Sequence, residues 1–209
     1  MTSSWDRTLP KRTSPWPATP RRKRRTSTTR TERRAGTSPV ALALGGNVAN
    51  VGDPGTVERT LARALRHLEA SLGPLRIASL YRSAPLSPVA QPDFLNTAAV
   101  AHTALEPEAV LALAKALELA AGRLPPALAV RFGPRPLDVD VLLYGGRRSD
   151  APELTLPHPR LRERRFMLEP LAEIAPDWPV PPDGATVREL LARLGESQGL
   201  KRIGWSERA

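Results

Sequence analysis

Residues 137–144 read LDVDVLLY and carry the clearest strand signal in the chain. Apolar and acidic residues alternate through the first half, and an apolar run completes the stretch. Alternate residues of a strand share one face at a spacing of about 6.6 Å, so Asp138 and Asp140 are expected on one side and Val139 and Val141 on the other. This stretch predicts a strand that buries one face and presents two carboxylates on the opposite face.

Strand and helix patterns alternate on both sides of this stretch. Three further segments have the short apolar or alternating pattern of strands: 39–46, 76–83 and 94–103. Four segments have apolar residues at helical spacing: 54–72, 107–121, 164–174 and 186–194. The order strand, helix, strand, strand, helix, strand predicts an α+β fold, a ferredoxin-like βαββαβ sandwich with a C-terminal extension. Helices would cover one face of a mainly antiparallel sheet and leave the other face available for a site.

The basic character of the chain is concentrated at its start. The net charge is +10 over 209 residues, and residues 1–37 hold 11 of the 31 lysines and arginines but only two acids. This segment is rich in Ser, Thr, Pro and Arg and has few apolar residues to bury, so we predict a disordered tail over 1–37 and one domain over 38–209. The RRKRR run at 21–25 is compatible with a localisation signal or a nucleic-acid patch, but a solvated tail is the favoured interpretation.

Composition also limits the classes of protein to consider. The chain has no cysteine, which excludes a disulfide framework, a thiolate metal site and a cysteine nucleophile. Its apolar runs are far shorter than a membrane span, and no hydrophobic signal segment follows the basic start. These features favour a cytoplasmic protein. We also expect a monomer with small-molecule substrates and with no nucleic-acid or membrane partner.

The pair Asp138 and Asp140 is the sharpest chemical signal. Neighbouring carboxylates resist ionising together unless a cation lies between them. Oxygen ligands without cysteine favour Mg²⁺, which usually completes its shell with waters and substrate phosphates. An isolated Asp-x-Asp is more often a solvated strand edge, but Arg123, Arg131 and Arg135 stand just upstream. Because arginine binds phosphate oxygens bidentately, the whole group favours phosphoryl transfer.

His158 lies between two prolines in LPHPR and precedes a basic cluster. The cluster consists of Arg160, Arg162, Arg164 and Arg165. On this evidence a structural hydrogen bond and a bond to a phosphate are equally consistent with the histidine.

Five sequence blocks, read in order, carry a resemblance to a known family. They are ALGGN at 43–47, YRSAPL at 81–86, QPDFLN at 91–96, RFGPRPLDVDVLLYG at 131–145 and LPHPRLRERRFMLEPLAEIAPD at 156–177. Over about residues 39 to 180 the chain resembles the hydroxymethyldihydropterin pyrophosphokinases. The resemblance implies a diphosphotransferase of folate biosynthesis that moves pyrophosphate from ATP to 6-hydroxymethyl-7,8-dihydropterin, uses two Mg²⁺ ions and releases AMP.

The resemblance also implies a role for individual residues. The catalytic set would be Arg123, Arg135, Asp138 and Asp140, with the two aspartates holding both metal ions. The pterin would lie between Phe94 and Phe166 and contact Ser83, Pro85, Leu86 and Asn96. The ATP contacts would be Glu118, Arg131, Arg135, Thr155, His158 and Arg164.

One segment departs from the family pattern. Between Arg123 and Arg131 the family commonly carries further basic residues, whereas this chain reads LPPALAV. Fewer cations would weaken phosphate contacts, and two prolines would stiffen a loop expected to close over ATP. We expect an effect on affinity and rate, with the reaction unchanged.

Two alternative functions account for part of the pattern. A Mg²⁺-dependent nucleotidyltransferase or phosphohydrolase with another acceptor would explain the acids and arginines but not Phe94, Asn96 and Phe166. A basic nucleic-acid-binding protein would explain only the tail.

Overall fold

The main sheet is built around β1 (Ser38–Gly46), which pairs antiparallel with a neighbour on each side. These neighbours are β4 (Phe94–Thr103) and β5 (Asp138–Tyr144). β3 (Leu80–Ser83) pairs with β4, and β10 (Lys201–Ile203) pairs with β3, both antiparallel. The strand order is therefore β10-β3-β4-β1-β5.

This computed structural model describes part of the chain. The described residues are 16–17, 36–49, 56–86, 88–125, 127–195 and 199–206. Most of the segment expected to be a disordered tail lies outside them. Trp16 is described and buried, and its ring stacks on His67 with ring centroids 5.4 Å apart.

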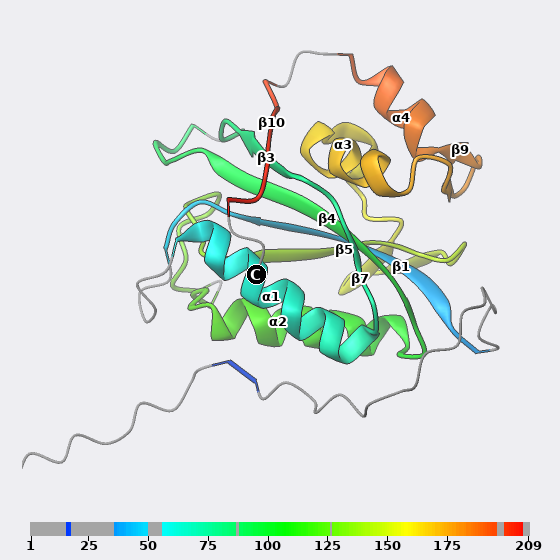
Figure 1. Cartoon of the computed structure of the whole chain (residues 1–209), viewed down its shortest axis with the longest axis horizontal. Helices are drawn as coiled ribbons and strands as arrows, with labels where there is room; N and C mark the ends of the chain where they lie inside the picture. The colour runs from blue at the N-terminus through cyan, green and yellow to red at the C-terminus, as the bar shows by residue number, and fades with distance from the viewer. Residues whose placement is uncertain are drawn as a thin grey trace, which may run out of the picture.

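Helices lie on both faces of the sheet, which corrects the expectation that helices would cover one face only (Figure 1). α1 (Val57–Leu72) and α2 (Pro107–Ala120) cover one face, and α3 (Arg165–Ile174) lies on the other, beside α4 (Val187–Arg193). A short 3₁₀ helix, η1 (Leu161–Glu163), precedes α3. α3 covers only part of its face, and the uncovered part is where the candidate site lies.

Local sequence explains where the two long helices begin and end. Thr56 caps α1 because its side chain accepts a hydrogen bond from the Arg59 backbone N–H at 3.2 Å. α1 ends at Gly73, whose φ of 99° is a conformation that glycine adopts readily. α2 begins with Pro107. Proline is tolerated at the first helical position because an N–H there would have no partner within the helix.

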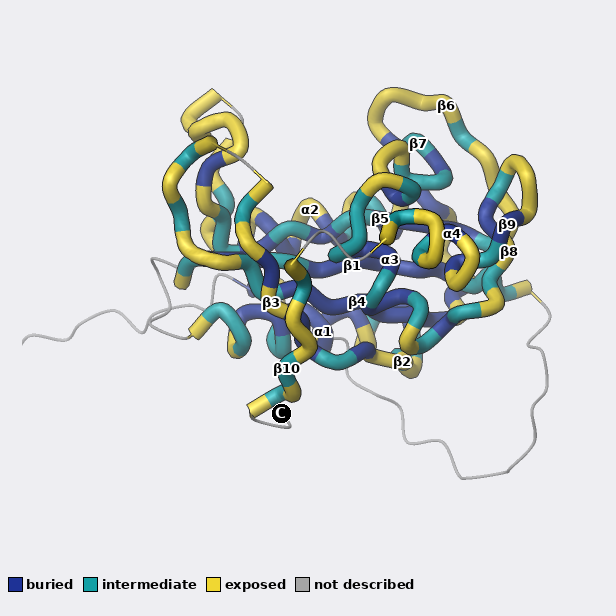
Figure 2. The backbone as a smooth tube through the Cα atoms, turned by 90° about the horizontal axis from the view of Figure 1, so that it is seen from above, coloured by how far each residue is buried: buried dark blue, intermediate teal, exposed yellow. Residues whose placement is uncertain are grey.

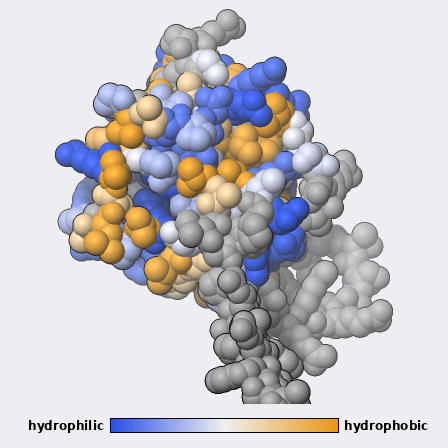
Figure 3. All heavy atoms as spheres, turned by 90° about the vertical axis from the view of Figure 1, so that its left-hand side faces the viewer, coloured by the Kyte–Doolittle hydropathy of each residue, from blue (hydrophilic) through white to orange (hydrophobic). Residues whose placement is uncertain are grey.

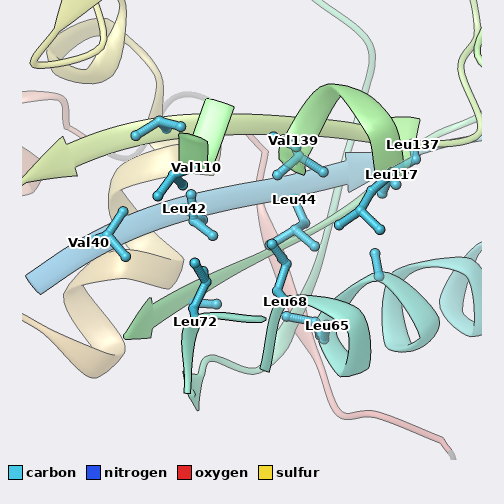
Figure 4. Close-up of a cluster of buried hydrophobic side chains, with 14 of the residues drawn as sticks. Val40, Leu42, Leu44, Leu65, Leu68, Leu72, Val110, Leu117, Leu137 and Val139 are labelled. Carbon is cyan, nitrogen blue, oxygen red and sulfur yellow. The ribbon is translucent and has the colours of Figure 1, made fainter. Parts of the chain in front are cut away.

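The two faces of the sheet have separate cores. Val40, Leu42 and Leu44 of β1 point toward α1 and α2, where Leu68 and Leu117 are fully buried (Figure 4). A second core lies against α3 and contains the alternate residues of the same strands. The central strands are accordingly buried along their length, whereas the loops at their ends are largely exposed (Figure 2).

The structure confirms the expected mixed fold with an antiparallel sheet, and it corrects details. The strand expected over 76–83 is divided into β2 (Arg76–Ile77), which pairs with β4, and β3. The break falls at Ala78, whose carbonyl oxygen accepts hydrogen bonds from the Thr97 hydroxyl and the Trp205 indole. Side chains thus satisfy the Ala78 carbonyl oxygen, while the Ala78 N–H still donates to the Ala98 carbonyl oxygen of β4 at 2.9 Å.

Several short strands in the C-terminal third carried no sequence signal. They are β6 (Ser149–Ala151), β7 (Leu154–Leu156), β8 (Pro179–Val180), β9 (Ala185–Thr186) and β10. Each is two or three residues long, which is too short for an alternating pattern to develop. In the described part of the chain no helix has the length and apolar character needed to cross a membrane.

Candidate active site

A cavity of about 430 Å³ opens on the α3 face of the sheet, at the end where β1 finishes and β4 begins. Its walls come from β1, the β3–β4 loop, β4, the loop before β5, β5, η1 and α3. Nine of the residues singled out from the sequence line it: Ser83, Leu86, Phe94, Asn96, Arg135, Asp138, Asp140, Arg164 and Phe166. Figure 3 views the molecule from this end of the sheet and shows apolar and hydrophilic side chains intermixed.

Strand alternation places both carboxylates in this cavity. Asp138 and Asp140 line it, whereas Val139 and Val141 between and after them belong to the core under α1 and α2. One short strand therefore contributes to stability through one face and to the site through the other.

Asp138 is held by two arginines. Its carboxylate forms an ion pair with Arg135 at 2.8 Å and another with Arg123. Burial raises the pKa of this carboxyl, but the two guanidinium groups outweigh burial and lower the pKa below its ordinary value. Asp138 is therefore a carboxylate at neutral pH.

Glu118 of α2 supports the same arrangement from beneath the sheet. It is 3% exposed, accepts a hydrogen bond from the Val139 backbone N–H at 2.9 Å, and pairs with Arg123 at 2.5 Å. Burial raises its pKa above the ordinary value. Glu118 thus connects the strand backbone between the two aspartates to an arginine that reaches one of them.

Asp140 has a different environment. Burial, followed by the charges of Asp138 and Glu118, raises its pKa to about 7. Within the described residues it forms no ion pair with a lysine or an arginine, and His158 Nε2 lies 3.9 Å from one of its carboxylate oxygens. Burial and then Arg164 lower the pKa of His158 to about 4, so the imidazole is neutral at pH 7. Because no arginine or lysine of the described residues pairs with it, the Asp140 carboxylate can bind a cation that arrives with a substrate.

The aromatic pair lies across the same cavity. Phe94 begins β4 and Phe166 lies in the first turn of α3, and both line the pocket. An arginine lies over each ring: Arg135 at 5.8 Å from the Phe94 centroid and Arg164 at 5.4 Å from the Phe166 centroid.

Asn96 is the polar group between these walls. It is 4% exposed, and its amide donates a hydrogen bond to the Ser83 hydroxyl at 3.0 Å. An amide carries both donor and acceptor atoms, so Asn96 can also pair with the edge of a bound heterocycle.

Six residues expected at the site lie outside the cavity lining. They are Pro85, Glu118, Arg123, Arg131, Thr155 and His158. Arg123 and His158 touch the aspartates as described, and Arg131 lies over the Phe132 ring at 4.9 Å. The Thr155 hydroxyl donates to the Ala151 carbonyl oxygen at 3.1 Å, within the β6–β7 hairpin. Their direct contacts with ATP or pterin stay predictions.

Two charged residues that line the cavity were not among the site residues predicted from the sequence. Arg160 and Glu163 line the pocket beside Arg164. Arg160 and Arg164 form no ion pair with any described residue. Burial, followed by the positive charge of Arg160, lowers the pKa of Arg164, and the charges of Asp140 and Asp138 oppose this shift only in part. The spacing of four residues was the available signal, but the basic cluster gave no means of choosing among its arginines.

Comparison with known proteins agrees with these features. Residues 41–176 match the family described as 7,8-dihydro-6-hydroxymethylpterin-pyrophosphokinase. A 2-amino-4-hydroxy-6-hydroxymethyldihydropteridine pyrophosphokinase of Methylorubrum extorquens is 41% identical over 165 residues, covering 78% of this chain and 96% of the relative. The enzyme of the same description from Pseudomonas aeruginosa is 38% identical over 164 residues, covering 78% of this chain and 96% of the relative.

Solved structures show the same fold. Crystal structures of Plasmodium falciparum HPPK-DHPS, including a triple mutant with STZ-DHP, superpose with a TM-score of 0.60 at 16% identity. The match covers 82% of this chain and 48% of that chain, so the present chain spans about half the length of the Plasmodium protein.

Proposed function

This chain belongs to the 7,8-dihydro-6-hydroxymethylpterin-pyrophosphokinase family and transfers pyrophosphate from ATP to hydroxymethyldihydropterin in folate biosynthesis, and we propose that the 430 Å³ cavity binds both substrates. The observation that carries this proposal is the sharing of one cavity by Asp138, Asp140, Phe94 and Phe166. A paired carboxylate site and an aromatic slot are what a magnesium-bound triphosphate and a flat heterocycle respectively require.

Asp138 and Asp140 are the proposed magnesium ligands, and we propose two ions. The described residues contain no group of three or more His, Cys, Asp or Glu side chains able to hold a metal. Two carboxylates alone fit Mg²⁺, because this ion keeps waters and completes its shell with substrate phosphates. The bound ions would neutralise phosphate charge and orient the attacking and leaving oxygens.

The arginines have the complementary task of holding the phosphates. Arg135, Arg160 and Arg164 line the cavity, and the last two lack an acidic partner among the described residues. A guanidinium binds phosphate oxygens through two parallel hydrogen bonds, which fixes orientation as well as charge. Arg123 would act from behind Asp138, since it is already engaged with that carboxylate and with Glu118.

The pterin ring would occupy the slot between Phe94 and Phe166. Stacking on both faces leaves the ring edge for Asn96, whose hydrogen bond to Ser83 fixes the orientation of its amide. The hydroxymethyl group would then point toward the phosphates held beside Asp138 and Asp140. Positioning of this kind supplies most of the catalysis in phosphoryl transfer.

His158 would act as a neutral imidazole. Its pKa of about 4 means that it carries no charge at pH 7, so it can donate one hydrogen bond to a phosphate or to Asp140.

We further propose that the core is the ferredoxin-like βαββαβ sandwich expected from the sequence. The order β3-β4-β1-β5 and the antiparallel pairing of each neighbouring pair support it.

The test is an assay of the nucleotide product. Purified protein should convert ATP to AMP only when both hydroxymethyldihydropterin and Mg²⁺ are present. The pyrophosphate should be found on the pterin product. Release of ADP or inorganic phosphate, or AMP formation without the pterin, would contradict the proposal.

A further inference from the structure

Asn47 directly follows β1 and has no part in the cavity lining, yet it is 4% exposed and fully engaged. Its amide nitrogen donates to the Gln91 side-chain oxygen at 2.9 Å and to the Pro92 carbonyl oxygen at 3.0 Å. Its amide oxygen accepts from the Arg135 backbone N–H at 2.9 Å. The Asn47 backbone N–H donates to the Arg135 carbonyl oxygen at 3.0 Å. One side chain thus joins the end of β1 to two separate loops.

Each of these loops leads directly into a wall of the cavity. Pro92 is two residues before Phe94, which is the proposed pterin platform at the start of β4. Arg135 pairs with Asp138 at 2.8 Å and is three residues before it. The Asn47 amide therefore lies at the point where the aromatic side and the phosphate side of the site are tied together.

A second hydrogen bond strengthens the same link. The Gln91 amide nitrogen donates to the Phe132 carbonyl oxygen at 2.9 Å, so Gln91 bonds at once to Asn47 and to the loop that carries Arg135. Gln91 and Phe132 also line the cavity.

The backbone beside Asn47 packs closely against the segment that leads into β5. A Cβ added at Gly46 would lie 2.5 Å from the Pro136 carbonyl oxygen, so the end of β1 and the start of β5 are in direct contact. A buried amide with every hydrogen bond made is costly to replace, because its partners would be left unpaired. The three segments are thus joined by hydrogen bonds and by a close backbone contact.

We infer that Asn47 is a positioning residue that holds the loop carrying Arg135 against the loop leading to Phe94, and so sets the register between the pterin slot and the phosphate site. This inference rests on the proposed function of the cavity. It assigns Asn47 no contact with either substrate; the residue acts through Arg135, Pro92 and Gln91.

The test compares Asn47→Asp and Asn47→Ala with Thr103→Val. Asn47→Asp keeps an acceptor for the Arg135 N–H but turns a carboxylate toward two other acceptors. Thr103 is 3% exposed and its hydroxyl accepts from the Leu105 N–H at 3.1 Å at the opposite end of β4, so it matches the loss of a buried polar contact far from the cavity. Steady-state kinetics with both substrates and thermal melting are measured for each variant.

Both Asn47 variants are expected to lower kcat and to raise the KM for the pterin, each by roughly tenfold or more, because small misplacements of reacting groups are costly. Thr103→Val should lower the melting temperature with kcat and both KM values unchanged. Wild-type kinetics in Asn47 variants that merely melt earlier would overturn the inference.

A double-mutant cycle decides the matter even if Asn47→Ala does not fold. Gln91→Ala should reproduce the kinetic defect, and adding Asn47→Asp to it should cost less than the sum of the single changes. Fully additive effects would overturn the inference. Failure of the wild-type protein to form AMP from ATP and pterin would instead reject the proposed function, which keeps the two outcomes distinct.

Discussion

The two faces of the central sheet differ in chemistry although the same strands build both. Toward α1 and α2, β1 presents Val40, Leu42 and Leu44, and the surrounding side chains are apolar. Toward α3 it presents Ala41 and Ala43. Small residues on that second face leave space, and where α3 no longer covers them the neighbouring strands contribute carboxylates and an amide. Along each strand, the residues that face α1 and α2 therefore contribute to one core, whereas the alternate residues contribute to the second core and to the cavity.

The largest expected effect comes from the two carboxylates on the sheet face that α3 covers only in part. Asp138→Asn and Asp140→Asn should each reduce kcat by roughly a thousandfold or more, since a lost metal ligand removes several kcal/mol of charge stabilisation. AMP release is the measurement, with circular dichroism to show that the variants are folded. A kcat within tenfold of wild type for either variant would show that its carboxylate is not a metal ligand.

A loss of stability without a change in substrate binding is expected on the sheet face that α1 and α2 cover. Leu68→Ala on α1, at a position with no exposed surface, should lower the free energy of unfolding by about 2–5 kcal/mol, because it removes buried methyl groups and leaves a cavity. Denaturant unfolding gives this value. The KM for each substrate should stay at the wild-type level, and a large change in either KM at a temperature where the variant is folded would contradict the separation of the two faces.

Arg160, which lines the cavity, provides a further test of the proposed phosphate site. Arg160→Gln should raise the KM for ATP by roughly tenfold, the value of one lost charge-assisted hydrogen bond. Arg188→Gln is the matched control, because Arg188 pairs with Asp177 at 2.9 Å on α4 and lies outside the cavity lining. Equal ATP kinetics in the two variants would remove Arg160 from the phosphate site.

A smaller, pH-dependent effect is expected where α3 packs against β3. Glu173 accepts hydrogen bonds from the Ser79 N–H at 3.0 Å and from the Tyr81 hydroxyl at 2.9 Å, and it pairs with Arg202. Burial raises its pKa, but these contacts outweigh burial and hold the pKa below the ordinary value of 4.5.

Because the pKa is lower in the folded protein, Glu173 stabilises the fold above pH 4.5, and this stabilisation is lost as the pH falls through the folded-state pKa. Glu173→Gln should thus be less stable than wild type by about 1 kcal/mol at pH 7, and this difference should shrink as the pH falls below 4.5. Denaturant unfolding at pH 7 and at successively lower pH measures this. A stability difference that does not change with pH would contradict the assignment.

Much of the fold could be read from the sequence because the long elements have a clear period. The DVDV alternation placed Asp138 and Asp140 opposite the core, and residues 94–103 were expected as the strand that β4 forms. The family and its reaction, which the resemblance implied, are confirmed by the comparisons. The roles of individual site residues stay predictions, as do the monomeric state and the cytoplasmic location.

Other features could not be derived because they depend on contacts between distant segments. Asn47 meets residues 44 and 88 positions away, and no local pattern marks such a partner. β10 pairs with β3 across more than 100 residues, and its three residues are too few to show a period. Arg160 differs from its neighbour Arg162 only in direction: Arg162 binds Asp183 at 2.6 Å, away from the cavity.

In the proposed function, one cavity joins a magnesium site at Asp138 and Asp140 to a pterin slot between Phe94 and Phe166. The decisive measurement is a crystal structure with Mn²⁺, a non-hydrolysable ATP analogue and hydroxymethyldihydropterin, recorded at the manganese absorption edge. Two anomalous peaks are expected between the aspartates and the phosphates, with the pterin stacked between the two rings. Metal peaks away from both carboxylates, or a pterin outside this slot, would contradict it.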